Sequence, residues 1–140
     1  MQAIDCILLI DKDSISNHVS SALIRKHKLS QNILVASNCM EALEIIRTVK
    51  SQSGKAPGLI LMESNIRFER DRYYKDLEVF IESSRDQVQV VMLTNIIGHK
   101  DLAMVKSSGV EYVLCKPLTV ESLVNVIRHF QSRKLSGSAK

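Results

Sequence analysis

The chain has 140 residues, of which 45% are hydrophobic and 24% are charged, and its formal net charge is +4. This size and composition predict one globular domain with a substantial core and exclude a disordered chain. No apolar stretch approaches the roughly 20 residues that span a bilayer, and no basic region precedes the first apolar run, so we expect a cytoplasmic protein without a secretory signal.

The first third of the chain alternates between apolar runs and helical patterns. Ile4–Ile10 is a nearly continuous apolar run, as in a strand that is covered on both faces. A helix is predicted at Ser14–Lys28, because Asp13 or Ser14 can cap it with a side-chain oxygen. Its residues at helical spacing are Ile15, Val19, Ala22, Leu23 and Lys26.

The alternation continues with a strand at Asn32–Ala36 and a helix that Asn38 caps. The inward side of that helix is predicted to carry Met40, Leu43, Ile46 and Val49. A loop with Ser, Gly and Pro follows, and then a third strand at Leu59–Met62. The segment Ser64–Arg72 has no clear periodicity and is predicted to be a loop.

The second half repeats the pattern. A helix at about Tyr73–Ser84 should turn Leu77, Phe80 and Ile81 inward. A strand at Val88–Leu93 follows, and then a helix at Ile97–Ser108 that Gly109 ends. The last strand is predicted at Glu111–Cys115, and the last helix runs from its cap Thr119 to about Arg133. The inward residues of this helix are predicted to be Leu123, Val124, Ile127 and Phe130. Residues 1–133 are therefore predicted to form the domain, and residues 134–140 a flexible tail.

Strands that alternate with helices form parallel sheets through right-handed crossovers. Five such units predict an α/β, doubly wound, flavodoxin-like fold with five helices and the strand order 2-1-3-4-5. This order brings the carboxyl ends of strands 1, 3, 4 and 5 together. The polar residues at those ends are Asp11, Lys12, Asp13, Glu63, Thr94 and Lys116.

Four stretches resemble the receiver domain of bacterial two-component response regulators, the CheY-like family. They are Ile7–Asp13, Pro57–Glu63, Val90–Asn95 and Gly109–Leu118, the last being the most specific. The resemblance covers Ile4 to about Arg133. In this family an aspartate after strand 3 takes phosphate from a histidine kinase, and two acids after strand 1 help to hold Mg²⁺. A Ser or Thr after strand 4 and a Lys after strand 5 bind the phosphoryl oxygens.

By this resemblance, Thr94 and Lys116 are the phosphoryl-binding residues and Asp11 is the first acid. The chain departs from the family at three positions. Glu63 stands in place of the phosphate-accepting aspartate, and Lys12 stands in place of the second acid. Val113 stands where the family usually has a Tyr or Phe that moves on activation, and Tyr112 comes one residue early.

The first two departures suggest a metal-free site. The longer Glu63 side chain reaches toward the space of a phosphoryl group, and Lys12 brings a positive charge to the metal's place. Opposite charges about 4 Å apart attract by ~4 kcal/mol at an effective dielectric near 20, before desolvation is counted. We therefore expect Glu63 to pair with Lys116, Lys12 or both, and we expect no cofactor, since the Mg²⁺ site is degraded.

The resulting hypothesis is a non-enzymatic, stand-alone receiver that signals by protein contact without standard Asp phosphorylation. The resemblance implies a histidine kinase, phosphorelay or downstream signalling protein as partner. It also implies a possible homodimer through helix 4, strand 5 and helix 5. Basic residues are scattered among acids, so we expect no nucleic-acid partner.

Two alternatives stay open. Glu63 or Ser64 can be a phosphate acceptor, which would keep phosphotransfer. The Asp11–Asp13 spacing also has the Asp-x-Asp form of haloacid-dehalogenase-type phosphatases, with one Asp as nucleophile and the other as general acid. No acidic pair follows Lys116 to complete a Mg²⁺ site of that type. Asp13 has a simpler use as a helix cap. The three cysteines are predicted to be buried free thiols.

Overall fold

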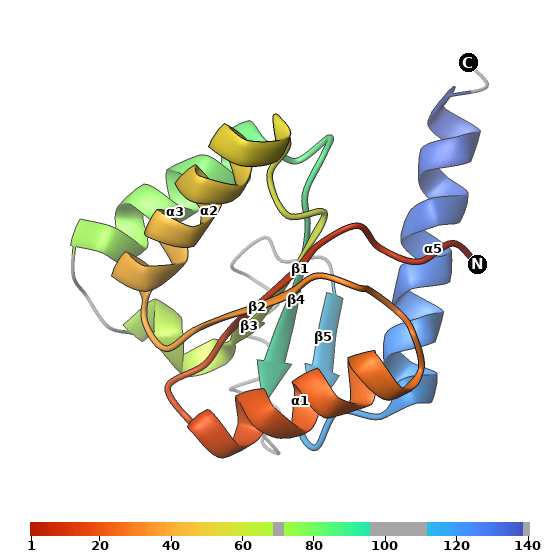
Figure 1. The fold of residues 1–140 in the computed structure, drawn as a ribbon, viewed down its shortest axis with the longest axis horizontal. Helices are drawn as coiled ribbons and strands as arrows, with labels where there is room; N and C mark the ends of the chain where they lie inside the picture. The colour runs from red at the N-terminus through yellow and green to blue at the C-terminus, as the bar shows by residue number, and fades with distance from the viewer. Residues whose placement is uncertain (69–71, 96–111, 139–140) are drawn as a thin grey trace.

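The computed structural model describes residues 1–68, 72–95 and 112–138 (Figure 1). Its elements are β1 (Ile7–Ile10), α1 (Ser14–Lys26), β2 (Ile33–Ala36), α2 (Cys39–Ser53), β3 (Leu59–Glu63), the 3₁₀ helix η1 (Ser64–Phe68), α3 (Arg72–Ser83), β4 (Gln89–Thr94), β5 (Tyr112–Cys115) and α5 (Val120–Ser138).

The five strands form one parallel sheet in the order β2-β1-β3-β4-β5, which confirms the predicted flavodoxin-like topology. The described residues contain four α-helices. The expected helix at residues 97–108, with Gly109 at its end, lies outside them. No helix among the described residues has the length and apolar character that crossing a membrane would require.

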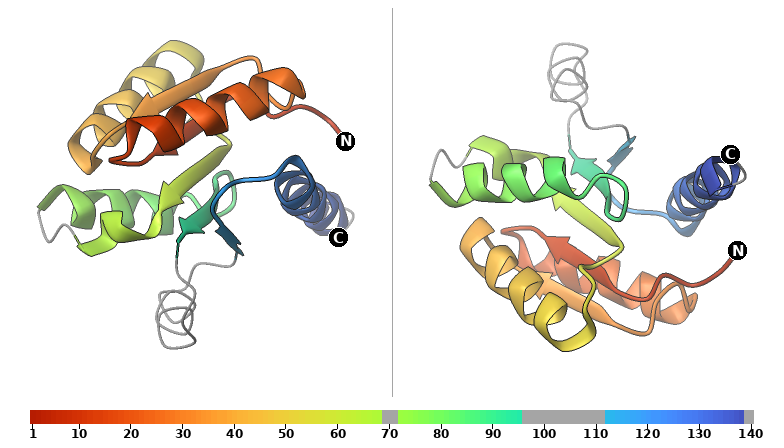
Figure 2. Two further views of the ribbon diagram at one scale, coloured as in Figure 1. Left: turned by 90° about the horizontal axis from the view of Figure 1, so that it is seen from below. Right: turned by 90° about the horizontal axis from the view of Figure 1, so that it is seen from above.

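The helices cover both faces of the sheet. Figures 1 and 2 show α2 and α3 together on one face and α1 and α5 on the other. Alternate strand residues face opposite sides of the sheet: Leu8 packs in the α2–α3 layer, whereas Leu9 packs in the α1–α5 layer. Burial of β1 and β3 on both faces explains their continuous apolar sequences.

Helix α2 follows its predicted pattern. Asn38 accepts a hydrogen bond from the Glu41 amide at 2.9 Å, which confirms the cap. Leu43 and Ile46 are buried, but Met40 is exposed. The helix ends at Gly54, whose φ of 77° lies in the left-handed region that glycine adopts without strain.

The buried face of helix α1 is mostly polar. Ile15 is 73% exposed and Val19 is 46% exposed, whereas the buried residues are Asn17, Ser20, Ser21 and Ile24. The helical spacing of Ile15 and Val19 therefore does not mark the buried face of α1. The Asn17 side chain donates a 2.9 Å hydrogen bond to the Asp11 carbonyl, and Ile24 is completely buried, so these two contacts set the rotation of the helix.

Several element bounds also differ from those predicted. Strand β1 begins at Ile7, and Ile4 makes only an isolated bridge to Ser30. The segment after β3 forms η1 instead of a loop, and its Ile66 is fully buried. Helix α5 continues to Ser138, into the segment assigned to a tail. The division of the chain into a domain and a tail stays a prediction.

Candidate functional site

The site lies at the carboxyl edge of the sheet, where four strands end in polar residues. Asp11 follows β1, Glu63 and Thr94 end β3 and β4, and Lys116 follows β5. The register places Glu63 beside Leu93 and Thr94 beside Cys115, so the four strand ends are level. The amide of Lys116 also donates to the Thr94 carbonyl at 2.9 Å. This edge therefore gathers the polar residues that the topology predicted.

Asp11 and Lys116 form an ion pair. The Lys116 Nζ donates to Asp11 Oδ2 at 2.5 Å, and the two side chains are only 12% and 5% exposed. The other oxygen, Oδ1, accepts the Asp13 amide at 2.9 Å. Both carboxylate oxygens of Asp11 are thus engaged, as a buried charge requires.

The expected pairing of Glu63 is wrong in its main part. Among the residues that the structure describes, Lys116 forms its ion pair with Asp11 and not with Glu63. The Glu63 carboxylate instead accepts the Asn65 amide at 3.0 Å. Each of the two carboxylates thus accepts the backbone amide of the second residue after it, and only Asp11 also receives the lysine.

Glu63 is a buried acid, with 5% of its surface exposed. Burial raises the pKa of its carboxyl above the ordinary value, because the charged form loses its hydration. The Asn65 hydrogen bond and the positive charges of Lys116 and Lys12 lower the pKa, and the charge of Asp11 raises it. The loss of hydration outweighs these opposing effects. Lys12 itself lies on the surface and acts on Glu63 through its charge.

Thr94 and Ser64 meet behind Glu63. The Ser64 hydroxyl donates to Thr94 Oγ1 at 3.2 Å, and both residues are buried. Thr94 thus occupies the predicted place after β4. Ser64, the alternative acceptor, is bound to a neighbouring hydroxyl, and it is almost inaccessible from outside.

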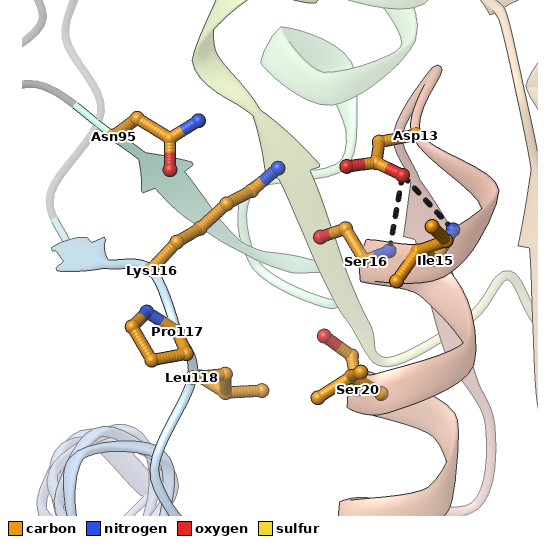
Figure 3. Close-up of a pocket in the computed structure, with 9 residues that line it drawn as sticks. Asp13, Ile15, Ser16, Ser20, Asn95, Lys116, Pro117 and Leu118 are labelled. Carbon is orange, nitrogen blue, oxygen red and sulfur yellow. Dashed lines mark hydrogen bonds between the residues drawn. The ribbon is translucent and has the colours of Figure 1, made fainter.

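Asp13 caps α1. Its Oδ1 accepts the amides of Ile15 at 2.9 Å and Ser16 at 3.4 Å, as the dashed lines of Figure 3 show. A side-chain oxygen at the start of a helix accepts hydrogen bonds from backbone N–H groups that have no partner within the helix.

The residues do not fit the Mg²⁺ ion that receiver domains use. Mg²⁺ needs near-octahedral oxygen ligands, and a receiver supplies part of them from two acids after strand 1. Here Lys12 replaces one acid, while Asp11 is held by the Lys116 ammonium. No group of three or more His, Cys, Asp or Glu residues within the described ranges is arranged to hold a metal.

Strand β5 carries its aromatic residue, Tyr112, on the opposite face of the sheet from Val113. Val113 packs against the α2–α3 layer, whereas Tyr112 packs against the α1–α5 layer. The Tyr112 hydroxyl lies 2.7 Å from His129 Nδ1, and the two rings meet edge-on with centroids 5.5 Å apart. Since adjacent strand residues face opposite ways, Tyr112 does not replace the aromatic residue that the family has at Val113. The Tyr112–His129 contact had no signal in the sequence.

A pocket of about 270 Å³ lies beside the site, between α1 and the segment after β5. Its walls include the exposed Ile15 and Val19, together with Leu118, Asn95 and Lys116 (Figure 3). The sequence analysis missed this pocket, although the unburied apolar residues of α1 belong to it. The Lys116–Pro117 peptide bond at its edge is cis.

None of the three cysteines forms a disulfide, and they do not share one environment. Cys6 and Cys39 are buried, as predicted, and burial raises the pKa of the Cys6 thiol. Cys115 is exposed, because it is the last residue of the edge strand β5. The prediction of burial is wrong for this residue.

No protein-family model and no curated protein matches the chain. Solved structures do match. A two-component response regulator from Cytophaga hutchinsonii is 23% identical, with a TM-score of 0.76 over 94% of this chain and 99% of that one. The bacteriophytochrome response regulator AtBRR is 20% identical, with a TM-score of 0.69 over 91% and 92%.

A third structure, a CheY-like response regulator receiver domain protein from Methanospirillum hungatei JF-1, is 14% identical. It has a TM-score of 0.69 over 96% of this chain and 99% of that one. These matches span nearly whole chains on both sides and agree with the observed strand order. The chain therefore has the fold of the CheY-like receiver domains of response regulators.

Proposed function

We propose that the protein is a receiver-type module of two-component or phosphorelay signalling that acts by protein contact, without phosphorylation of an aspartate after β3. The observation that carries this proposal is the Asp11–Lys116 ion pair. Both residues are the ones that a receiver directs at Mg²⁺ and at a phosphoryl group. Here they neutralise each other.

The character of Glu63 supports the same conclusion. A carboxylate that attacks a phosphorus atom needs its negative charge, access to the donor, and a cation that neutralises the incoming phosphoryl group. Burial favours the neutral form of Glu63 and limits access to it. The nearby Lys116 is already engaged by Asp11.

The proposed contact surface is the pocket between α1 and the segment after β5. Ile15 and Val19 expose apolar surface there, which a bound protein would remove from water. The partner class is a histidine kinase, a phosphorelay protein or a downstream signalling protein. A homodimer through the face that includes residues 97–108 remains a prediction, because that segment lies outside the described residues.

No catalytic role is assigned to the Asp-x-Asp pattern. In a phosphatase of that type, Asp11 would attack the substrate and Asp13 would act as general acid. In this chain Asp11 is paired with Lys116 and Asp13 caps α1. We infer a signalling module and not a hydrolase.

The test is a phosphorylation assay followed by intact mass measurement. The protein is incubated with acetyl phosphate and Mg²⁺, and a matched sample carries Glu63→Asp, which restores the family's acceptor. We expect no phosphoryl adduct on the natural chain. A stoichiometric adduct that disappears in Glu63→Ala or in Ser64→Ala would contradict the proposal and identify the acceptor.

A further inference from the structure

Three ionisable side chains meet at the carboxyl edge of the sheet, and only one of them is positive. Asp11, Glu63 and Lys116 are all nearly buried. The single ammonium is bound to Asp11 at 2.5 Å. Two carboxylates therefore share one buried cation, and the second carboxylate has no equal compensation for its lost hydration.

Glu63 is the acid without a direct ion pair among the described residues. Among the described residues, the charged groups that act on it are Asp11 after β1, Lys12 in the β1–α1 segment and Lys116 after β5. Its carboxylate accepts a hydrogen bond from the Asn65 amide, 3.0 Å away. A proton on Glu63 would leave this buried group of three side chains with no net charge.

We propose that Glu63 binds one exchangeable proton, and that loss of this proton draws Lys116 from Asp11 toward Glu63. The step is a simple acid dissociation. The O–H bond of the carboxyl breaks, water accepts the proton, and the electron pair stays on the carboxylate. The new negative charge then competes with Asp11 for the same ammonium.

The loss of the Glu63 proton would affect the pocket, because Lys116 forms the ion pair with Asp11 and also lines the pocket. Its side chain lines the pocket with Asn95 and Leu118, and Figure 3 shows it extending from the end of β5, above Pro117 and Leu118 in this view. A change of partner for its Nζ therefore changes the charge and shape of the pocket wall. A proton would thus alter the contact surface without phosphorylation.

This inference deepens the proposed function, on which it rests for the meaning of the pocket, but its chemistry can be tested alone. The experiment is a pH titration by NMR that follows the Glu63 side-chain carboxyl carbon and the Leu118 amide. We expect Glu63 to titrate at a higher pH than a glutamate in an unfolded peptide. We also expect the Leu118 signal to shift with the same midpoint.

Three variants make the outcome decisive. Glu63→Gln keeps the size of the side chain without its titration, and it should abolish the transition at Leu118. Asp11→Asn frees Lys116 for Glu63, and it should lower the Glu63 midpoint. The matched control, Glu44→Gln on the exposed side of α2, should leave both signals unchanged.

Two results would overturn the inference. One is a Glu63 midpoint at or below that of a glutamate in an unfolded peptide. The other is a Leu118 transition that survives in Glu63→Gln. Neither result depends on partner binding or on phosphorylation. A phosphoryl adduct in the mass assay would instead remove the proposed function and leave the proton chemistry standing.

Discussion

The interior of the sheet and its carboxyl edge lie one residue apart along each strand, yet different interactions stabilise them. Ile10 and Met62 are buried among apolar neighbours in the α2–α3 layer. The next residues, Asp11 and Glu63, are equally buried but are charged or chargeable. An apolar side chain is stabilised by many small contacts, whereas a buried charge depends on one or two specific partners.

This difference predicts how each region responds to substitution. Loss of an interior side chain leaves a cavity whose cost is local and nearly independent of distant changes. Loss of a charge at the edge leaves its partner buried and uncompensated, so substitutions there should be strongly non-additive. Four predictions use this contrast, beginning with the largest expected effect.

Lys116→Met should destabilise the protein by about 3–5 kcal/mol, because Asp11 would keep a buried negative charge without its ammonium. Urea unfolding followed by circular dichroism measures the change. The double variant Asp11→Asn/Lys116→Met should recover part of the loss. If the losses of stability in Asp11→Asn and Lys116→Met simply add in the double variant, the charged edge responds to substitution as the apolar interior does, which would contradict the expected coupling.

Leu77→Ala in α3 should cost about 2–5 kcal/mol, since Leu77 is completely buried in the α2–α3 layer. Val79→Ala on the same helix is the matched control. Its side chain is 64% exposed, so the change should stay within about 0.5 kcal/mol. Both are read from the same urea titration. Equal losses for the two variants would show that α3 does not pack as described.

Asp13→Ala should cost about 1 kcal/mol, the usual value of a helix cap. Asn38→Ala, which removes the cap of α2 away from the site, should cost a similar amount. Each should add to the effect of Lys116→Met. Strong coupling between Asp13 and Lys116 would instead place Asp13 inside the charge cluster.

Glu63→Gln should remove a pH dependence of stability. The pKa of Glu63 is raised in the folded protein, so the folded state binds more protons than the unfolded state between the two pKa values. The contribution of Glu63 is therefore fully present below the unfolded pKa and is lost as the pH rises through the folded pKa. Relative to Glu63→Gln, the natural chain should become less stable as the pH rises. Thermal unfolding of both chains across this range gives the comparison, and parallel curves would contradict it.

Much of the fold could be predicted because its signals are local. Continuous apolar runs such as Leu59–Met62 mark strands that are buried on both faces, and their alternation with helices fixes a parallel sheet. The Asn38 cap also depends only on residues nearby in the chain. The buried face of α1 could not be predicted from the spacing of its apolar residues, because it includes the tertiary hydrogen bond from Asn17 to the Asp11 carbonyl.

The sequence predicted which residues lie at the site, but it did not predict which of them form hydrogen bonds and ion pairs with one another. Topology alone brings Asp11, Glu63, Thr94 and Lys116 to one edge. The choice of Asp11 over Glu63 as the partner of Lys116 is a matter of side-chain geometry, which no sequence pattern encodes. The pocket was missed for a related reason, since its walls come from α1 and from the segment after β5.

The most direct test of the metal-free site is a Mg²⁺ titration of the natural chain, followed by NMR at the amides of Asp11, Asp13 and Glu63. The ion pair between Asp11 and Lys116 predicts no saturable shift at these amides at sub-millimolar Mg²⁺, and no change in the Lys116 side-chain signal. Saturable binding at these residues, together with release of Lys116 from Asp11, would contradict the account.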